Sequence, residues 1–477
     1  MFPIFATAVA IVICLVGLEV NSQAGQEELN PLTASILMII PLGEILIFIA
    51  KKRAASFGFR ASQVLFRIFS VLPIACFAVA VFFFRITAIS HSLGAGDWPL
   101  VDKLVLMASY VAISNGVRIY RFRFARAIRF HAPAYSKTGL MIAFRGELTV
   151  LIPFLVFMLF HDLITLNEKL DTYFTHLPAL FWLVLMAMFL GLIYTMPDFI
   201  RWLWRLHPIP AGTPIRQELL EFMKSLRFTA KDILVWNTKR LIMNAAILGF
   251  LPRSRYILFT DTLLQGLTTL EIKAVFAHEI GHGRKKHITL YLFFSFAFIF
   301  GLAVLESLVP PLIRIEERLD VLLPCYGVVV VLYWWIVFGF LSRRFEMEAD
   351  IFGAHAVKNP SLFIHTLSRV ASIGGVEKRK GSWRHFSIER RMISLKKIFL
   401  IDPVSAFRFF RKMTWIKRIL ITMSLLVSLL FAWHLTVDTV AGIGSLAAEK
   451  GDFETGQKYL DLACNLPMGR IHQWTLL

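Results

Sequence analysis

The sequence predicts a mainly α-helical protein that crosses a membrane about nine times. Hydrophobic residues make up 57% of the 477 residues and charged residues only 17%, a balance that is not typical of soluble globular domains. Nine apolar stretches also reach about 20 residues, the length that a helix needs to cross a bilayer. These stretches are residues 2–20, 32–50, 66–84, 99–117, 147–165, 178–200, 288–309, 321–341 and 417–438.

Basic residues collect in alternate loops between these stretches. Clusters of lysine and arginine follow the second and the fourth stretch, whereas the intervening loops are short and lean acidic. The positive-inside rule therefore places the N-terminus in the cytoplasm and the C-terminus outside. This distribution also accounts for the net charge of +19, so we expect no nucleic-acid partner. The first stretch has no basic segment before it, which favours an uncleaved anchor over a signal peptide.

This topology leaves two long cytoplasmic segments, residues 201–287 and 342–416. Within the first segment, residues 244–250 and 255–260 have the composition of two short strands. They flank the sequence Leu251-Pro252-Arg253-Ser254, which is typical of a turn. We therefore expect a small β-hairpin in an otherwise helical cytoplasmic domain.

A predicted helix that begins near Thr268 carries two histidines four residues apart. Thr268-Thr269 provides a threonine N-cap, and the carboxylate of Glu271 in the first turn complements the helix dipole. His278 and His282 lie one turn apart on the same face, so both imidazoles can bind one Zn²⁺ ion. Glu279 completes a His-Glu-x-x-His pattern and can accept a proton from a water molecule that the metal activates.

A catalytic zinc site needs a third protein ligand. Two spanning stretches separate His282 from Glu346, and an even number returns Glu346 to the cytoplasmic side. Glu346 is therefore the candidate third ligand, and Asp350, one turn later, can hydrogen-bond a ligating histidine. Glu348 points about 200° away from Glu346 around the helix, and His287 is one residue too early for the spacing of a third histidine ligand. The alternative is that the three carboxylates form a solvated acidic helix face.

Together these motifs resemble those of the HtpX and CAAX prenyl protease type-one family of membrane-integrated zinc metallopeptidases. The resemblance covers roughly residues 240–395 and follows the order of the family. It implies that one zinc ion per chain is bound by His278, His282 and Glu346, with Glu279 as the catalytic base. The matching pieces are Asn244-Ala245, the His-Glu-x-x-His pattern, Ser342 to Glu346 with Ala349-Asp350, and His385 with Arg391.

The resemblance also implies roles for residues outside the metal site. Asn244 and Ala245 would belong to an edge strand that receives the substrate backbone. His385 and Arg391 would stabilise the oxyanion that forms during hydrolysis. The family usually has proline where this chain has Phe386. Alternatively, His385 and Arg391 belong to a basic patch that contacts anionic lipid.

The motifs and the apolar stretches together divide the chain into four predicted parts. An N-terminal membrane domain with about six spans is followed by a metallopeptidase core, a last span and an external helical tail. The tail is either an isolated tetratricopeptide-like repeat or a small amphipathic helical hairpin. The predicted bounds are residues 1–200, 201–416 (with the spans 288–309 and 321–341), 417–438 and 439–477.

The predicted function is zinc-dependent endoproteolysis of membrane or membrane-proximal proteins, as in quality control. One alternative is a CAAX-type protease that processes lipid-modified C-termini, and another is a non-proteolytic zinc-binding scaffold or transporter. The expected partners are a protein or peptide substrate and the lipid bilayer, while the sequence does not indicate an oligomeric state. We expect a multi-pass protein of a bacterial inner membrane with its active site on the cytoplasmic side, or of the endoplasmic reticulum in a eukaryote.

Overall fold

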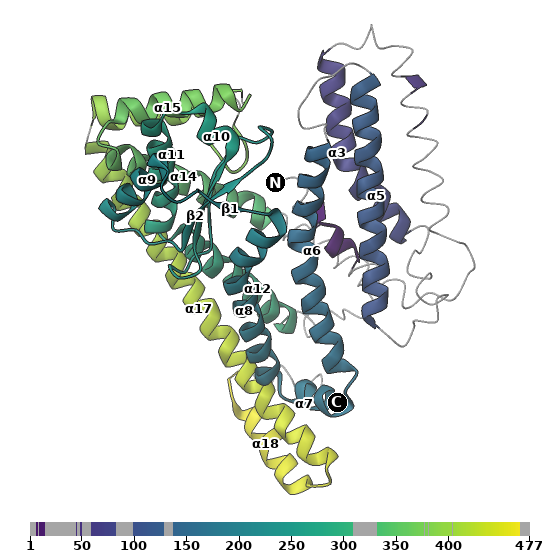
Figure 1. Cartoon of the computed structure of the whole chain (residues 1–477). Helices are drawn as coiled ribbons and strands as arrows, with labels where there is room; N and C mark the ends of the chain where they lie inside the picture. Colours follow the sequence, from purple (N-terminus) through teal and green to yellow (C-terminus); the bar gives the residue numbers. More distant parts are fainter. Residues whose placement is uncertain are drawn as a thin grey trace. The chain divides into compact units, whose positions relative to one another are not determined.

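The computed structural model of the chain is mainly helical and contains one small β-sheet (Figure 1). Of the predicted spanning stretches, 2–20, 32–50 and 321–341 lie mostly outside the described residues. The structure describes residues 6–7, 9–14, 44, 48–49, 59–82, 99–127, 137–308, 332–375, 377–379, 381–402 and 404–467.

Four of the described helices are long and apolar enough to cross a membrane. They coincide with four of the nine predicted stretches. Two further stretches, 66–84 and 99–117, are helical but do not meet this criterion in the described residues. The four helices are α6 (Lys137–Thr165), α8 (Pro178–Trp204), α12 (His287–Leu308) and α17 (Val404–Glu449).

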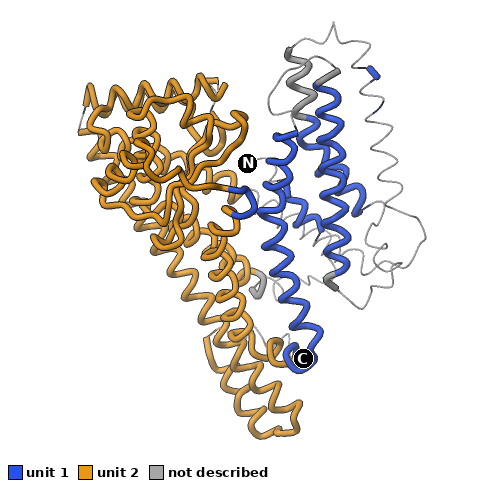
Figure 2. The backbone as a smooth tube through the Cα atoms, viewed as in Figure 1, with its two compact units in different colours: residues 1–171, 202–205 blue, residues 172–201, 206–477 orange. Residues whose placement is uncertain are grey.

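The chain divides into two compact units, which are coloured differently in Figure 2. The first unit comprises residues 1–171 and 202–205, and the second comprises residues 172–201 and 206–477. All the residues of the predicted metal site belong to the second unit. The division predicted from the sequence, with bounds at residues 200, 416 and 438, stays a prediction.

The first unit is built from α3 (Phe59–Phe82), α5 (Pro99–Ala127) and α6. Phe77 of α3 and Tyr110 of α5 are fully buried, and their rings meet edge to face with 5.4 Å between centroids. Arg118 of α5 forms an ion pair with the buried carboxylate of Glu147 in α6. Because an unpaired buried carboxylate would be costly, this pair ties the two helices together.

The sheet of the second unit has four strands in the order β1-β2-β4-β3. Parallel pairing joins β2 to β4, while β1 and β3 are antiparallel to their neighbours. The predicted hairpin is confirmed, because β3 pairs with β4 from Ala245 opposite Phe259 to Leu248 opposite Tyr256. The hairpin lies in a larger mixed sheet than expected, with β3 at one edge. The strands are β1 (His207–Pro208), β2 (Asp232–Trp236), β3 (Ala245–Leu248) and β4 (Tyr256–Thr260).

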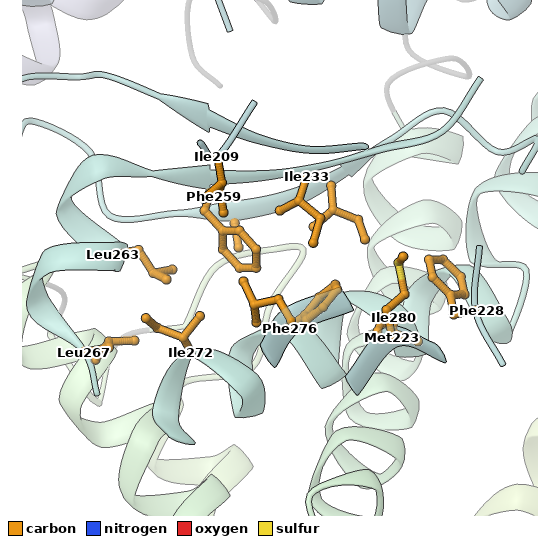
Figure 3. Packing of buried hydrophobic residues seen from close by; sticks show 13 residues of the cluster. Ile209, Met223, Phe228, Ile233, Phe259, Leu263, Leu267, Ile272, Phe276 and Ile280 are labelled. Atoms are coloured by element: carbon orange, nitrogen blue, oxygen red, sulfur yellow. The ribbon is translucent and has the colours of Figure 1, made fainter. Parts of the chain in front are cut away.

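The core of the second unit lies between one face of the sheet and the helix that carries the two histidines. Figure 3 shows Ile233 and Phe259 of the sheet lying over Phe276 and Ile280 of α11 (Thr269–Arg284). The rings of Phe259 and Phe276 meet edge to face at 5.6 Å. All four side chains are fully buried, and burial of each stabilises the fold by about 1.5–3 kcal/mol. The sheet therefore holds one face of α11 and leaves the opposite face for the site.

The remaining helices of the second unit surround this core and extend from it. In Figure 1, α17 runs from the sheet region to α18, which packs back along it. The turn between these two helices contains Gly451, with φ at +85°. The remaining helices are α7 (Glu168–His176, which begins in the first unit), α9 (Pro214–Ser225), α10 (Asp261–Gly266), η2 (Tyr333–Phe338), α14 (Gly339–Ala356), α15 (Pro360–Ile373), α16 (Ile388–Lys396), η3 (Lys397–Ile401) and α18 (Phe453–Asn465).

Candidate metal centre

Two helices, α11 and α14, supply the candidate metal ligands. The start of α11 is fixed by the predicted cap, because the Thr268 side chain accepts a hydrogen bond from the Glu271 backbone and the Glu271 side chain accepts one from the Thr268 backbone. The two helices approach closely at Gly281, where an added Cβ would lie 3.1 Å from the Cα of Ala349. A glycine at this position therefore lets the two histidines of α11 face the glutamate of α14.

The structure brings His278, His282 and Glu346 together. The Nε2 atoms of the two histidines are 3.3 Å apart. Glu346 Oε2 lies 3.7 Å from His278 Nε2, and Glu346 Oε1 lies 3.5 Å from His282 Nε2. Tetrahedral zinc with Zn–N distances of about 2.0–2.1 Å separates its ligand atoms by roughly 3.3 Å. Two imidazole nitrogens and a carboxylate in this arrangement fit a zinc ion with one position left open.

The electrostatic state of two of the three ligands, Glu346 and His282, suits a cation. Although burial disfavours its charge, Glu346 has a pKa well below the usual value because of His385 and the two histidines. Burial and the neighbouring His278 lower the pKa of His282 to about 3. Glu346 therefore stays ionised and His282 stays neutral at physiological pH, and these are the forms that bind a metal.

Glu279 lies beside the ligands without being one of them. Burial raises the pKa of its carboxyl group to about 7, although the neighbouring His278 opposes this shift. A carboxylate with a pKa near the working pH can both accept and return a proton. This property is expected of a general base rather than of a structural residue.

Asp350 orients the first histidine. Its Oδ1 lies 2.9 Å from Nδ1 of His278, the nitrogen opposite the metal-facing Nε2. Arg391 donates to the same carboxylate from Nε at 2.7 Å and from Nη2 at 2.5 Å. Burial opposes ionisation of Asp350, but Arg391 keeps its pKa below the usual value. This contact agrees with the position expected for Asp350 from its spacing to Glu346.

His385 and Arg391 both face Glu346, although they differ in exposure. His385 Nδ1 lies 3.3 Å from Glu346 Oε2, and Arg391 Nη1 lies 3.9 Å from the same oxygen. The side chain of His385 is 37% exposed, whereas Arg391 is buried and engaged with Asp350. His385 is therefore the more accessible of the two to a substrate bound at the site.

Asn244 and Ala245 lie at the start of the edge strand. Ala245 begins β3, and the Asn244 backbone N–H donates to the Thr260 hydroxyl at 3.0 Å. Among the described residues, no strand pairs with the outer edge of β3. Since α11 packs against β3, an extended peptide added to this edge would run alongside the helix of the two histidines.

A further set of residues that the sequence did not reveal supports His282. His287 is fully buried, and its Nδ1 lies 3.0 Å from Nδ1 of His282. On its other side, His287 Nε2 lies 2.9 Å from Glu348 Oε2. Lys417 of α17 donates to Glu348 at 2.9 Å. The spacing of His287 argued against a role as a metal ligand, and it gave no sign of this contact with His282.

The histidine pair with its intervening glutamate, completed by a carboxylate from a second helix, defines a site of the zinc-metallopeptidase type. Residues 212–431 match the profile described as Peptidase family M48. The chain therefore carries a domain of this zinc-metallopeptidase family, and the resemblance noted in the sequence is confirmed. The chain is a multi-pass membrane protein, and its residues 212–431 form a domain that matches the M48 family.

Two plant proteins named CAAX prenyl protease 1 homolog are similar to part of the chain. The protein from Arabidopsis thaliana is 30% identical over 161 residues, which are 30% of this chain and 37% of the relative. The protein from Oryza sativa subsp. japonica is 36% identical over 89 residues, which are 18% of this chain and 20% of the relative. The chain thus aligns with well under two thirds of the length of either relative.

A solved structure is also similar to the chain. The crystal structure of S. mikatae Ste24p is 16% identical, with a TM-score of 0.47. The match covers 77% of this chain and 98% of the solved one.

Proposed function

We propose that the protein is a zinc-dependent endopeptidase that hydrolyses peptide bonds of membrane or membrane-proximal proteins, with one zinc ion per chain held by His278, His282 and Glu346. One observation carries the proposal: ligand atoms of three residues lie 3.3–3.7 Å from one another, and Glu279, which interacts electrostatically with His278 and Glu346, is not one of these ligands. A purely structural zinc site would use a fourth protein ligand and would not need this base.

The bound zinc ion would supply a Lewis acid that lowers the pKa of a water molecule and polarises the scissile carbonyl. Glu279 accepts the proton of that water and then returns it to the leaving amine. His385 would donate a hydrogen bond to the carbonyl oxygen, and Arg391 would place positive charge near it, where negative charge develops. Asp350 holds the ring of His278 in the orientation that keeps its Nε2 toward the metal.

The edge strand β3 is the proposed binding site for the substrate backbone. Asn244 and Ala245 would align an extended peptide beside α11 through backbone hydrogen bonds. We place the active site on the cytoplasmic side of the membrane, because the basic loops of the sequence favour that orientation. A bacterial inner membrane and the membrane of the endoplasmic reticulum both agree with this placement.

The substitution Glu279→Gln tests this function. Wild type and variant would be purified in detergent, assayed for bound zinc, and incubated with an unfolded membrane protein as substrate. We expect both to hold one zinc ion and the variant to lose at least about 10²-fold in cleavage rate. Glu221→Gln, an exposed substitution on α9, is the matched control and should cleave like wild type. Wild-type cleavage by Glu279→Gln would reject the mechanism, and a wild type without zinc would reject the ligand set.

The names of the plant relatives support a second candidate function, the processing of lipid-modified C-termini. Cleavage of a prenylated peptide would be compared with cleavage of the same peptide without the lipid. A rate that depends on the prenyl group favours this candidate, and equal rates favour the broader endopeptidase.

A further inference from the structure

A pocket of about 420 Å³ lies beside the second histidine ligand. Its wall includes His282 and the residues that follow it at the end of α11 and the start of α12. The turn that connects β3 to β4 and the segment after α9 complete the wall. Four basic side chains line it: Arg227, Arg255, Arg284 and Lys286. None of the pocket-lining residues is acidic.

Arg255 is the unusual member of this group because it is only 8% exposed. Its guanidinium donates to the backbone oxygens of Phe250 and, at 3.5 Å, of Thr229, and it lies 4.6 Å from the centroid of the Phe228 ring. Its Nε is buried without a hydrogen-bond partner. In the part of the chain that the structure describes, no carboxylate forms an ion pair with Arg255.

A buried cation without a counter-charge is costly, and proteins normally pair it. Lys286 and Arg284 have an ordinary explanation, because basic residues at the end of a helix complement its dipole. That explanation does not extend to Arg227 and Arg255, which come from other segments of the chain. The convergence of Arg227 and Arg255 from two other segments onto the basic end of α11 points to an anion that enters the pocket from outside.

We propose that this pocket binds a carboxylate of the peptide substrate, either an acidic side chain or the C-terminal carboxylate, close to the scissile bond. This inference rests on the proposed peptidase function. The pocket begins where β3 ends, at Gly249 and Phe250, and it reaches the metal ligand His282. A peptide paired with β3 and crossing the metal centre would therefore continue into it. Arginine binds carboxylates with particularly favourable geometry.

The test compares matched peptides with the full chain in nanodiscs of neutral phosphatidylcholine. Each peptide is internally quenched and carries Glu or Gln at one position within three residues of the scissile bond. A second pair carries a free or an amidated C-terminus at the same distance. We expect the wild type to prefer the carboxylate at one position, or at the C-terminus, by about tenfold or more in kcat/KM. The two pairs distinguish the two sources of the carboxylate.

The variants remove the cations of the pocket without touching the metal ligands. The triple substitution Arg227→Gln/Arg284→Gln/Lys286→Gln changes exposed side chains and should reduce the preference severalfold, because it lowers kcat/KM for the carboxylate peptide more than for its uncharged partner. Arg255→Gln should remove most of the remaining preference. Lys224→Gln, exposed on α9 and not part of the pocket wall, should retain the wild-type preference.

Binding of the same peptides to Glu279→Gln, measured by fluorescence anisotropy, separates this inference from the proposed function. Selective binding without any wild-type cleavage keeps the pocket and rejects the peptidase. Cleavage without preference for a carboxylate rejects the pocket and keeps the peptidase. A preference that survives both pocket variants also overturns the proposal. The assay is repeated in nanodiscs that also contain phosphatidylglycerol. If the triple variant loses only a stimulation by this lipid, the pocket binds lipid headgroups and the proposal is wrong.

Discussion

His287 and Glu348 are joined by a buried hydrogen bond of 2.9 Å between Nε2 and Oε2. Since His282 would bind the metal through Nε2, its Nδ1–H is free to donate to Nδ1 of His287. The Nε2–H of His287 then donates to Glu348. Each ring thereby has one defined tautomer, so the carboxylate of Glu348 orients His282 through His287.

We expect His287→Phe to lower the affinity for zinc by about 10–100-fold, because it removes both hydrogen bonds and leaves the ring of His282 free to turn. Phenylalanine preserves the stacking of this residue on the Phe345 ring, 4.3 Å away, so the packing should survive. The affinity would be measured by competition with a fluorescent zinc chelator. His355→Phe, exposed on the same helix as Glu348, is the control. Wild-type affinity in His287→Phe would show that the contact does not position the ligand.

The buried pair between Asp350 and Arg391 predicts a large loss of stability. The Asp350→Asn variant leaves the Arg391 guanidinium buried without its counter-charge, which costs about 3–5 kcal/mol. The thermal unfolding midpoint should fall strongly, and zinc should bind more weakly because His278 loses its partner. Asp402→Asn removes the carboxylate of a more exposed pair with Arg408 and should change stability by less than about 1 kcal/mol. Equal effects of the two variants would refute this account.

The cap of α11 predicts that the contribution of Glu271 to the stability of the folded protein depends on pH. Burial opposes the charge of Glu271, but hydrogen bonds from Thr268 hold its pKa below the usual value. A carboxyl group with a lowered pKa in the folded state stabilises the protein fully above its unfolded pKa of about 4.3. The contribution is lost as the pH falls through the folded pKa. Glu271→Gln should therefore lower the unfolding midpoint at neutral pH and have little effect in acid.

The hydroxyl of Thr268 provides a separate check of the same cap. Thr268→Ala should cost about 1 kcal/mol, because the backbone N–H of Glu271 loses its acceptor. Thr213 occupies the N-cap of α9 but accepts no capping hydrogen bond there, so Thr213→Ala is the matched control. Circular dichroism during heating in detergent measures both. A pH-independent effect of Glu271→Gln, or equal effects of the two threonine variants, would contradict the assigned cap.

The candidate ligands could be proposed from the sequence by two simple arguments. His278 and His282 are one helical turn apart, and an even number of predicted spans between them and Glu346 puts all three on the same side of the membrane. The structure brings the three residues together. Asp350 followed from the same helical period. The threonine cap was equally local, although only the structure distinguishes Thr268 from Thr269 as the capping residue. These features need no knowledge of how distant segments pack.

The supporting contact of His287 could not be predicted in this way. It depends on the end of α11, where Lys286 adopts a φ of +57° and α12 begins at His287. This turn redirects the chain, so His287 comes back against His282 although its spacing fits no metal motif. The only indication of this contact in the sequence was Glu348. It points away from the metal, although Glu346 and Asp350 on the same helix face the metal site. The sheet was likewise underestimated, since β1 has only two residues and β2 pairs in parallel with β4, which is not the next strand along the chain.

The close approach of α11 and α14 leads to a final prediction. An added Cβ at Gly281 would lie 3.1 Å from the Cα of Ala349 and 3.2 Å from its carbonyl oxygen. These are backbone atoms and cannot rotate away, so Gly281→Ala should push the helices apart and cost about 1–3 kcal/mol.

Because Glu346 is one turn from Ala349 on α14, the same displacement should separate it from the two histidines and reduce bound zinc. Zinc content after gel filtration and the unfolding midpoint measure the two effects. Gly191→Ala in α8 meets no atom within 4 Å and should leave both unchanged or raise the midpoint slightly, since alanine favours a helix. A Gly281→Ala protein that retains full zinc and wild-type stability would show that this contact does not set the spacing of the metal ligands.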